Sequence, residues 1–341
     1  MEIVIDKGFL DGFFRYNFTE EKKAVYDSFI HFIKNIKRGV KVICDFDDYD
    51  ELETYVTANP LLHAIEEREP HYELKSDLSQ LVKQAGFYNH GNAFKMFFLK
   101  TPCEECNVLE GQVGYSFMNA EDLNQKWKRF LTAKELTRYH ISTNPEIDPN
   151  ERFDAWGKIQ DYPHPVNSIV IADKYVLCDK SGQRIEHNLK PLLLELIPNR
   201  KMLVPVDVTI IASQKESNRE FSQIKSELDS FFKMKLPLVQ VNLTIIDFDD
   251  KVKAHVESEV DSDFHDRRIV TNYYWYEVGK GFNLFKRANQ LRPSNSKLYM
   301  GFNLYGSNQV DVKLLLEEYS ACAAVAENVH GENKNRLLNL N

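Results

Sequence analysis

The chain has 341 residues, of which 43% are hydrophobic, and its formal net charge at pH 7 is −8. This length and apolar content allow a large core and favour two domains. The net negative charge argues against a large surface that binds nucleic acid non-specifically, because such a surface must be positively charged. The sequence has no apolar run of the roughly 20 residues that span a bilayer and no signal-peptide layout, and its five cysteines do not form a disulfide framework, so a cytoplasmic protein without a membrane span is expected.

The first 140 residues alternate between strand and helix patterns. Short runs rich in β-branched and aromatic residues indicate strands, and apolar residues at helical spacing indicate helices. The expected strands are Glu2–Ile5, Val40–Cys44 and Ala93–Leu99, and the expected helices are Glu20–Ile36, Leu61–Glu69, Lys75–Gln84 and Glu121–Leu131. Because a mostly parallel sheet flanked by helices buries such an alternation, residues 1–140 are predicted to form an α/β domain.

A linker is predicted at residues 141–166, which are rich in Pro, Asn, Asp and Ser and should carry little regular structure. The alternation resumes in residues 167–341, so a second α/β domain is expected there. Its expected strands are 168–177, 206–212, 239–248, 267–278 and 297–305, and its expected helices are 187–197, 217–233 and 310–328. The sequence also lacks a Gly-rich phosphate loop followed by Lys-Ser/Thr, which argues against P-loop ATP or GTP hydrolysis.

Two of the N-terminal strands run directly into aspartates. Asp6 follows the first strand, Asp45 and Asp47 follow the second, and Asp122 opens a later helix. The first 150 residues hold 18 Lys and Arg against 25 Asp and Glu, an excess that fits either a divalent-metal site or a solvated surface. Acids at strand ends resemble the layout of PIN-like nucleases, where they hold Mg²⁺ or Mn²⁺ for phosphodiester cleavage. The resemblance implies metal ligands at these four positions, although Asp is also common after strands and at helix starts.

The most informative stretch begins at His265 and Arg267, two residues apart at the start of a predicted strand. Alternate residues of a strand share a face, so both side chains are expected to point into one pocket and meet the same phosphoryl group. Arg268 and Lys280 are predicted to join Arg267 in binding phosphate. The alternative is that His265 and Arg267 cap the strand and pair with nearby aspartates.

The spacing of His265, Arg267, Asn272 and Gly279 resembles the motif of phospholipase D-like proteins, in which Lys and Asp stand at the second and third positions. The resemblance implies a phospholipase D-like domain from about Ser168 to the C-terminus. It also implies His265 as the nucleophile, Arg267 as the phosphate ligand, and Asn272 in place of the carboxylate that stabilises the imidazolium.

A second resemblance concerns the His265-Asp-Arg267 start and the later Gly279-Lys-Gly281. These residues are similar to the C-terminal domain of proteins bearing microtubule-interacting and transport modules, which lacks catalysis, binds lipid head groups and dimerises. The chain carries one copy of the motif, so catalysis there would need a homodimer that brings two copies of His265 together.

Two further patterns are candidate sites. Cys103 and Cys106 have metal-ligand spacing, but a structural zinc site needs two more ligands, and His90 is the nearest candidate. The aromatic run Tyr273–Tyr276, followed by several basic residues, could stack bases, although alternate residues of a strand must face a core.

The predicted function is therefore that of a phosphodiester-directed protein, a nuclease or nuclease-like effector of a kind that would suit bacterial host defence. Its expected partners are nucleic acid or another phosphodiester ligand and a second copy of the chain. The alternative is a non-catalytic module that binds phosphate or a protein partner and drives oligomerisation.

Overall fold

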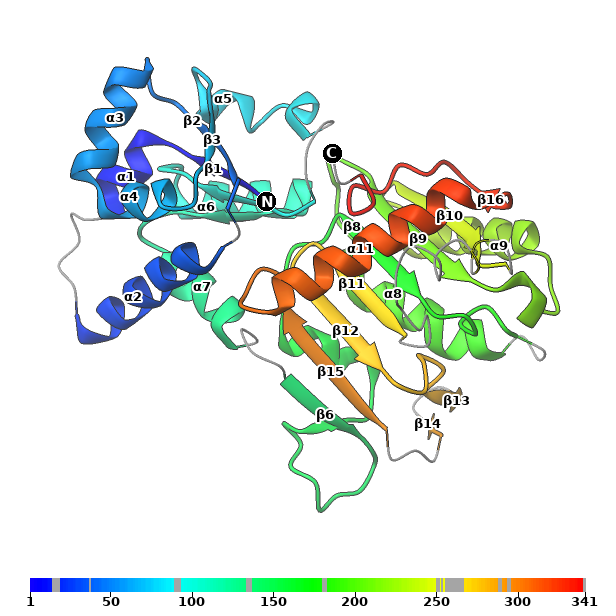
Figure 1. The fold of residues 1–341 in the computed structure, drawn as a ribbon. Coiled ribbons are helices and arrows are strands. Elements are labelled where there is room, and N and C mark those ends of the chain that lie inside the picture. Colours follow the sequence, from blue (N-terminus) through cyan, green and yellow to red (C-terminus); the bar gives the residue numbers. More distant parts are fainter. Residues whose placement is uncertain are drawn as a thin grey trace.

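The structure of the protein is a computed structural model, and it describes residues 1–13, 19–36, 38–88, 93–132, 137–179, 183–249, 252, 254, 267–287, 290–292 and 296–339. The described chain forms an α/β protein with one five-stranded parallel sheet and one nine-stranded mixed sheet, which occupy the two sides of the molecule (Figure 1). Among the helices in these residues, none combines the length and apolar character needed to cross a bilayer.

The first sheet has the strand order β3-β2-β1-β4-β5, and all of its neighbours are parallel. Its strands are β1 (Glu2–Ile5), β2 (Lys41–Cys44), β3 (His71–Leu74), β4 (Lys95–Phe98) and β5 (Ser116–Met118). The expected strands at β1, β2 and β4 are confirmed, whereas β3 and β5, of four and three residues, are strands that the sequence patterns did not predict. Since β1 lies between β2 and β4, the chain reverses its direction of strand addition at β1.

Helices cover both faces of this sheet. The helices are α1 (Lys7–Phe13), α2 (Glu20–Asn35), α3 (Tyr49–Ala58), α4 (Pro60–Glu66), α5 (Leu78–Leu81), α6 (Cys103–Val113) and α7 (Leu123–Thr132), with the 3-10 helix η1 at Ala85–Tyr88. Successive strand residues point to opposite faces: Ile3 and Ile5 share a core with α1, α2, α4 and α7, while Val4 packs with α5 and α6. The predicted three-layer packing is therefore present.

The second sheet has the order β16-β10-β9-β8-β11-β12-β15-β6-β7. Its strands are β6 (Thr137–Ile141), β7 (Arg152–Phe153), β8 (Ser168–Ala172), β9 (Val206–Ala212), β10 (Val241–Asp247), β11 (Arg268–Thr271), β12 (Tyr274–Val278), β15 (Lys297–Phe302) and β16 (Val329–His330). β8, β9 and β10 form a parallel block, β11, β12, β15 and β6 follow in antiparallel order, and β7 pairs with β6 in parallel. The expectation of a mostly parallel second sheet is thus wrong for its larger part.

Helices also cover the two faces of the parallel block. The helical elements of this half are η2 (Trp156–Asp161), the π-helix η3 (Ile185–Leu189), α8 (Lys190–Leu196), η4 (Gln214–Glu216), α9 (Phe221–Lys235) and α11 (Asn308–Val325), and a separate hairpin joins β13 (Phe285–Arg287) to β14 (Gln290–Leu291). Figure 1 shows α11 lying across one face of the sheet. Val170 packs with α11, whereas Ile169 and Ile171 pack with α8 and α9 on the other face.

The segment predicted as one long strand, Arg267–Val278, forms a hairpin instead. β11 ends at Thr271, and β12 begins at Tyr274 and runs back along it, with Val270 opposite Trp275. The Thr271 hydroxyl accepts hydrogen bonds from the backbone N–H groups of Tyr273 (3.4 Å) and Tyr274 (3.1 Å) and closes the turn. Asn272 and Tyr273 therefore lie in a turn and not on a strand edge.

The predicted linker, residues 141–166, carries more structure than its composition indicates. It contains β7 and η2, and β6, which ends at its first residue, belongs to the nine-stranded sheet through β15. Trp156 and Ile159 are buried in a core that also includes residues of the first sheet. The segment is therefore packed against both halves of the described molecule.

Buried hydrogen bonds join the two sheets. The hydroxyl of Tyr273 donates to the backbone oxygen of Lys95 on β4 (2.5 Å) and accepts from the N–H of Ser116 on β5 (2.7 Å). Asn272 Nδ2 donates to the backbone oxygen of Ala93 (2.8 Å). The turn between β11 and β12 thus fastens the second sheet to the first.

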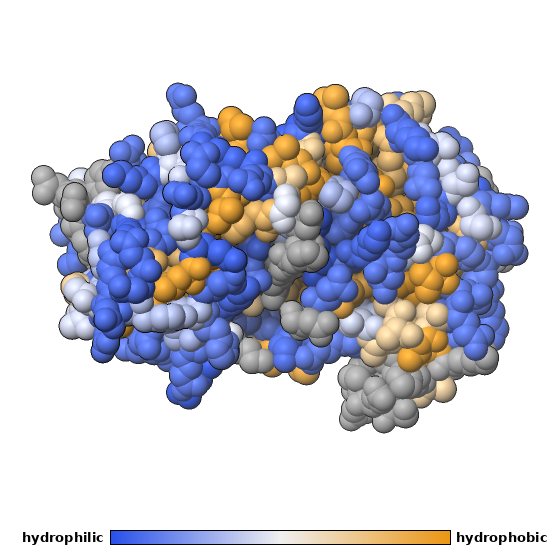
Figure 2. Space-filling model, turned by 90° about the horizontal axis from the view of Figure 1, so that it is seen from above, coloured by the Kyte–Doolittle hydropathy of each residue, from blue (hydrophilic) through white to orange (hydrophobic). Residues whose placement is uncertain are grey.

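Hydrophilic residues predominate on the face shown in Figure 2, where hydrophobic residues form small groups. Among the residues that the structure describes, the exposed large hydrophobic side chains come from several helices and loops: Tyr49, Val108, Leu194, Leu203, Met234, Leu238, Val310, Leu314 and Val325.

Candidate functional site

The carboxyl ends of β1 and β2 bring Asp6 and Asp45 together. The two strands are parallel neighbours and are paired up to Ile5 and Cys44, so the residues that follow them lie side by side at one edge of the sheet. In open parallel sheets, ligands bind outside the carboxyl ends of the strands where strand order reverses. In this sheet the reversal falls at β1, directly below Asp6.

Asp6 is a buried carboxylate held by backbone N–H groups. Its Oδ1 accepts from Phe9 (2.6 Å), and the N–H of Lys100, just past β4, donates to Oδ1 (3.1 Å) and Oδ2 (2.8 Å). Burial, reinforced by the charge of Asp45, outweighs these hydrogen bonds and raises the pKa of Asp6 to about 6. Ionisation of Asp6 is therefore unfavourable, because its carboxylate is buried and lies near a second acid, Asp45.

Asp45 and its neighbours are arranged around Lys7. Asp45 Oδ1 accepts the backbone N–H of Lys7 (2.7 Å), and burial raises the pKa of this carboxyl. The ammonium group of Lys7 lies 3.1 Å from Glu51 and 3.7 Å from Asp47, whose side chain is 87% exposed. Of the three predicted metal ligands that follow the first two strands, Asp47 is thus the most open to solvent.

Asp122 lies further along the edge, beyond β5. Its Oδ1 accepts the N–H of Asn119 (2.8 Å), and its Oδ2 is 3.1 Å from Lys126 Nζ. Asn119 in turn donates to the backbone oxygens of Lys100 (3.1 Å) and Thr101 (2.5 Å). Asp122 is therefore tied into the β5 end of the sheet, two strands away from Asp6.

In the second sheet, Arg267 lies at the carboxyl edge of the parallel block. Its Nε is 3.7 Å from the Asp173 carboxylate at the end of β8, its Nη1 donates to Gly279 O (2.9 Å), and its guanidinium stacks on Tyr175. Asp173 is almost fully buried and accepts the N–H groups of Tyr175 (2.9 Å) and Phe282 (2.9 Å). His265, predicted to share a pocket with Arg267, lies outside the described residues.

Asn272 is fully buried, and both its oxygen and its nitrogen are used within the protein. Oδ1 accepts the N–H groups of Asn167 (2.9 Å) and Ser168 (3.1 Å), while Nδ2 donates to Asn167 Oδ1 (2.8 Å) as well as to Ala93. These bonds anchor the turn between β11 and β12 to the start of β8. An amide is required there because the site needs an acceptor and a donor at once.

The other predicted phosphate ligands differ in their surroundings. Arg268 Nε donates to Glu277 across the hairpin (2.9 Å), and Lys280 is exposed. In the aromatic run, Tyr273, Tyr274 and Tyr276 are buried and only Trp275 is partly exposed. The run therefore serves mainly as core.

The two cysteines at metal-ligand spacing lie in the first turn of α6. Cys106 is buried, and its thiol donates to the backbone oxygen of Thr101 (3.3 Å), while Cys103 is partly exposed. Burial raises the pKa of the Cys106 thiol to about 12, which disfavours the thiolate that zinc needs. His90 lies outside the described residues.

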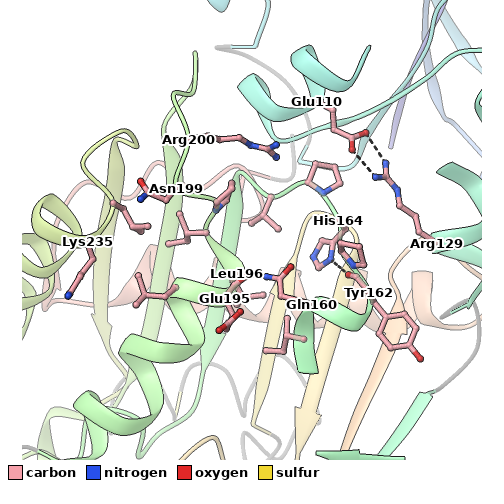
Figure 3. A pocket seen from close by; sticks show the side chains of 18 residues that line it. Glu110, Arg129, Gln160, Tyr162, His164, Glu195, Leu196, Asn199, Arg200 and Lys235 are labelled. Atoms are coloured by element: carbon pink, nitrogen blue, oxygen red, sulfur yellow. Dashed lines mark hydrogen bonds and ion pairs between the residues drawn. The ribbon is translucent and has the colours of Figure 1, made fainter. Parts of the chain in front are cut away.

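A cleft of about 620 Å³ lies between the two halves. Its walls come from α6, α7, the 159–166 segment, the end of α8 with the residues that follow it to 200, and the end of α9. Figure 3 shows the charged side chains that line it: Glu110, Arg129, Glu195, Arg200 and Lys235. The sequence patterns did not predict this site. A weak signal for it is Gly111, a glycine inside helix α6.

His164 forms part of this cleft in a neutral state. Its Nδ1 lies 2.9 Å from the backbone oxygen of Tyr162 and its Nε2 lies 3.0 Å from the Thr271 hydroxyl, so the ring is assigned as an Nδ1–H donor and an Nε2 acceptor. Burial, with a smaller contribution from the charge of Arg129, lowers the pKa of His164 to about 4. The ring joins the 159–166 segment to β11.

The fold and these sites define an α/β protein with acids at the carboxyl edge of one sheet and a charged cleft between two sheets. Neither the protein-family models nor the curated proteins compared with the chain match it.

Proposed function

We propose that the chain is a phosphodiester-directed protein whose five-stranded sheet carries a divalent-metal site for nuclease-type cleavage. The proposal depends on the proximity of Asp6 and Asp45 at the ends of adjacent parallel strands. Burial raises the pKa of both carboxyls, and the charge of Asp45 raises that of Asp6 further. A bound cation would stabilise the ionised form of such a pair.

Two carboxylates suit Mg²⁺ or Mn²⁺, which can bind with few protein ligands, better than they suit a metal ion whose ligands must all come from the protein. Among the described residues no group of three or more His, Cys, Asp and Glu is arranged to hold a metal ion. Mg²⁺, however, commonly takes one or two protein carboxylates and completes its shell with water and substrate phosphates. Asp6 and Asp45 retain lone pairs beyond those that accept backbone N–H groups.

In this proposal a bound Mg²⁺ supplies Lewis-acid assistance to phosphodiester cleavage. Asp6 and Asp45 hold the negative charge that recruits it, and the backbone of Lys100 orients Asp6. The Lys7 ammonium keeps Asp47 and Glu51 close to the same edge.

We further propose that the nine-stranded half is a second, phospholipase D-like domain with a binding role, in a chain that forms a homodimer. Two observations favour binding over catalysis there. Asn272 is fully engaged in holding the β11–β12 turn, and Arg267 already lies beside the buried Asp173. Arg267 remains partly exposed and can add a phosphate contact.

A cleavage assay tests the proposal. Single- and double-stranded DNA and RNA are incubated with the protein, with and without Mg²⁺ or Mn²⁺. We expect metal-dependent cleavage that falls at least about a hundredfold in Asp6→Asn and Asp45→Asn, since losing a charge-stabilising group in a site commonly costs about 3 kcal/mol or more. The matched control is Asp27→Asn, which removes an exposed carboxylate from α2.

The outcomes show which half of the molecule carries the activity. Metal-independent cleavage that is lost in His265→Ala would move the activity to the nine-stranded half and overturn the metal proposal. Absence of cleavage under every condition, together with no Mg²⁺- or Mn²⁺-induced rise in the melting temperature, would favour the non-catalytic binding module.

A further inference from the structure

The cleft between the two halves contains one arginine whose charge is not balanced by a described carboxylate. Glu110 and Arg129, which line one end, form a bidentate pair, with both N–O distances 2.8 Å. Burial opposes ionisation of Glu110, but the hydrogen bonds and charge of Arg129 outweigh it and hold the pKa of Glu110 below its usual range. This pair is therefore charged and internally neutral.

Arg200 adds a positive charge beside that neutral pair. Figure 3 shows its side chain extending toward α6 and the Glu110 end of the cleft, while the Glu195 carboxylate is directed away from it. Among the described residues, Arg200 has no ion pair with a carboxylate, and its guanidinium is left exposed toward the cleft. Lys235 lies at the opposite end (Figure 3) and adds a second exposed cation.

Gly111 accounts for the position of Arg200. A Cβ atom at Gly111 would lie 2.8 Å from Arg200 Nη1 and 3.0 Å from its Cζ, so only glycine lets the guanidinium lie against α6. A glycine inside a helix costs about 1 kcal/mol relative to alanine. Gly111 thus lowers the stability of α6 but leaves space for the Arg200 guanidinium, which has no carboxylate partner among the described residues.

The rest of the lining is mixed in polarity. Ile159, Val166, Leu196 and Ile197 form the buried backing of the cleft, each at most 4% exposed, whereas Leu194 is 37% exposed and the neutral ring of His164 is partly exposed. A volume of about 620 Å³ matches a single nucleotide-sized ligand, since small-molecule sites commonly measure about 300–1,000 Å³.

We propose that this cleft binds a phosphorylated small molecule of nucleotide size, with its phosphate on Arg200 and its ring beside Leu194 and His164. The planar guanidinium fork matches phosphate oxygens. Because α6 and α7 belong to one half and α8 and α9 to the other, the ligand would bridge the two sheets. The proposal does not depend on a metal at Asp6.

Calorimetric titration of the full chain tests this site. The four ribonucleoside monophosphates, the matching nucleosides and inorganic phosphate are titrated in EDTA, so that metal binding makes no contribution. At least one monophosphate should bind at least tenfold more tightly than its nucleoside. Arg200→Ala should weaken that binding at least tenfold, with partial retention in Arg200→Lys.

Gly111→Ala distinguishes a ligand site from a structural contact. The added methyl group should displace the guanidinium and weaken monophosphate binding, while the melting temperature stays unchanged or rises because alanine favours the helix. Arg138→Ala, which removes an exposed arginine on β6, should bind as the unaltered protein does. Unchanged affinity in Arg200→Ala, no binding of any monophosphate at millimolar concentration, or binding of oligonucleotides alone would each overturn the proposal.

Discussion

The backbone N–H of Lys100 donates to both carboxylate oxygens of Asp6, at 3.1 and 2.8 Å, and thereby joins the ends of β1 and β4. The bond fixes an acid at the point where strand order reverses, next to Asp45, which directly follows β2. The edge of this sheet therefore holds a repulsive charge pair in a defined geometry.

The first prediction concerns the effect of Asp6 on stability. Its pKa rises from 3.8 in the unfolded chain to about 6 on folding, so the folded state holds this proton more tightly. The resulting stabilisation is present below pH 3.8 and is lost as pH rises through about 6. One pH unit of pKa change corresponds to about 1.4 kcal/mol. The unfolding free energy of Asp6→Asn relative to the unaltered protein should therefore improve by about 2 kcal/mol between pH 4 and pH 7, measured by urea denaturation in EDTA. A constant difference across this range would contradict the assignment.

His164 should have the opposite effect on the pH dependence of the unfolding free energy. Its pKa falls from 6.5 to about 4 on folding, so its contribution to stability is present above pH 6.5 and is lost as pH drops toward 4. For this partly exposed ring we expect about 1–2 kcal/mol of acid destabilisation. His164→Gln should remove that loss in denaturation series at pH 7 and pH 4.5. If the variant and the unaltered protein lose equal stability on acidification, the ring is not held neutral.

Asn272→Asp would introduce the residue that phospholipase D-like proteins carry at the corresponding position of their motif, yet it should destabilise the fold. The carboxylate would face Ala93 O and Asn167 Oδ1, two acceptors that now receive hydrogen bonds from Nδ2. Losing these donors and burying a charge should cost about 3 kcal/mol or more. Urea denaturation at pH 7 measures this cost. Full stability combined with new phosphodiesterase activity would show that the position serves catalysis.

Tyr273→Phe should weaken the contact between the sheets. The variant loses the bond to Lys95 O and leaves the N–H of the fully buried Ser116 without its acceptor. An unsatisfied buried donor costs about 1–3 kcal/mol. Chemical denaturation should show a loss in this range, and Tyr49→Phe, at an exposed tyrosine, should show almost none. Equal effects of the two substitutions would contradict the role given to Tyr273.

Local patterns in the sequence were sufficient for strands β1, β2 and β4, for helices α2, α4 and α7, and for placing Asp6 and Asp45 at the ends of two strands, but they did not predict helices α1, α3 and α6. Strand composition and the rule that parallel strands end at one edge depend only on neighbouring residues and on strand direction. Three-residue strands such as β5 contain too few residues to show a period, and for that reason they escaped prediction.

Only the tertiary structure decided the roles of the turn and the cleft. The segment 267–278 has uniform strand composition, and its reversal at Asn272 follows from hydrogen bonds to Ala93 and Asn167, which are distant in sequence. Likewise, β6 joins the second sheet because β15, more than 150 residues later, supplies its hydrogen-bonding edge. Arg200 meets Gly111 for the same reason: side chains far apart in the chain become neighbours through packing, and local periodicity carries no information about which ones will meet.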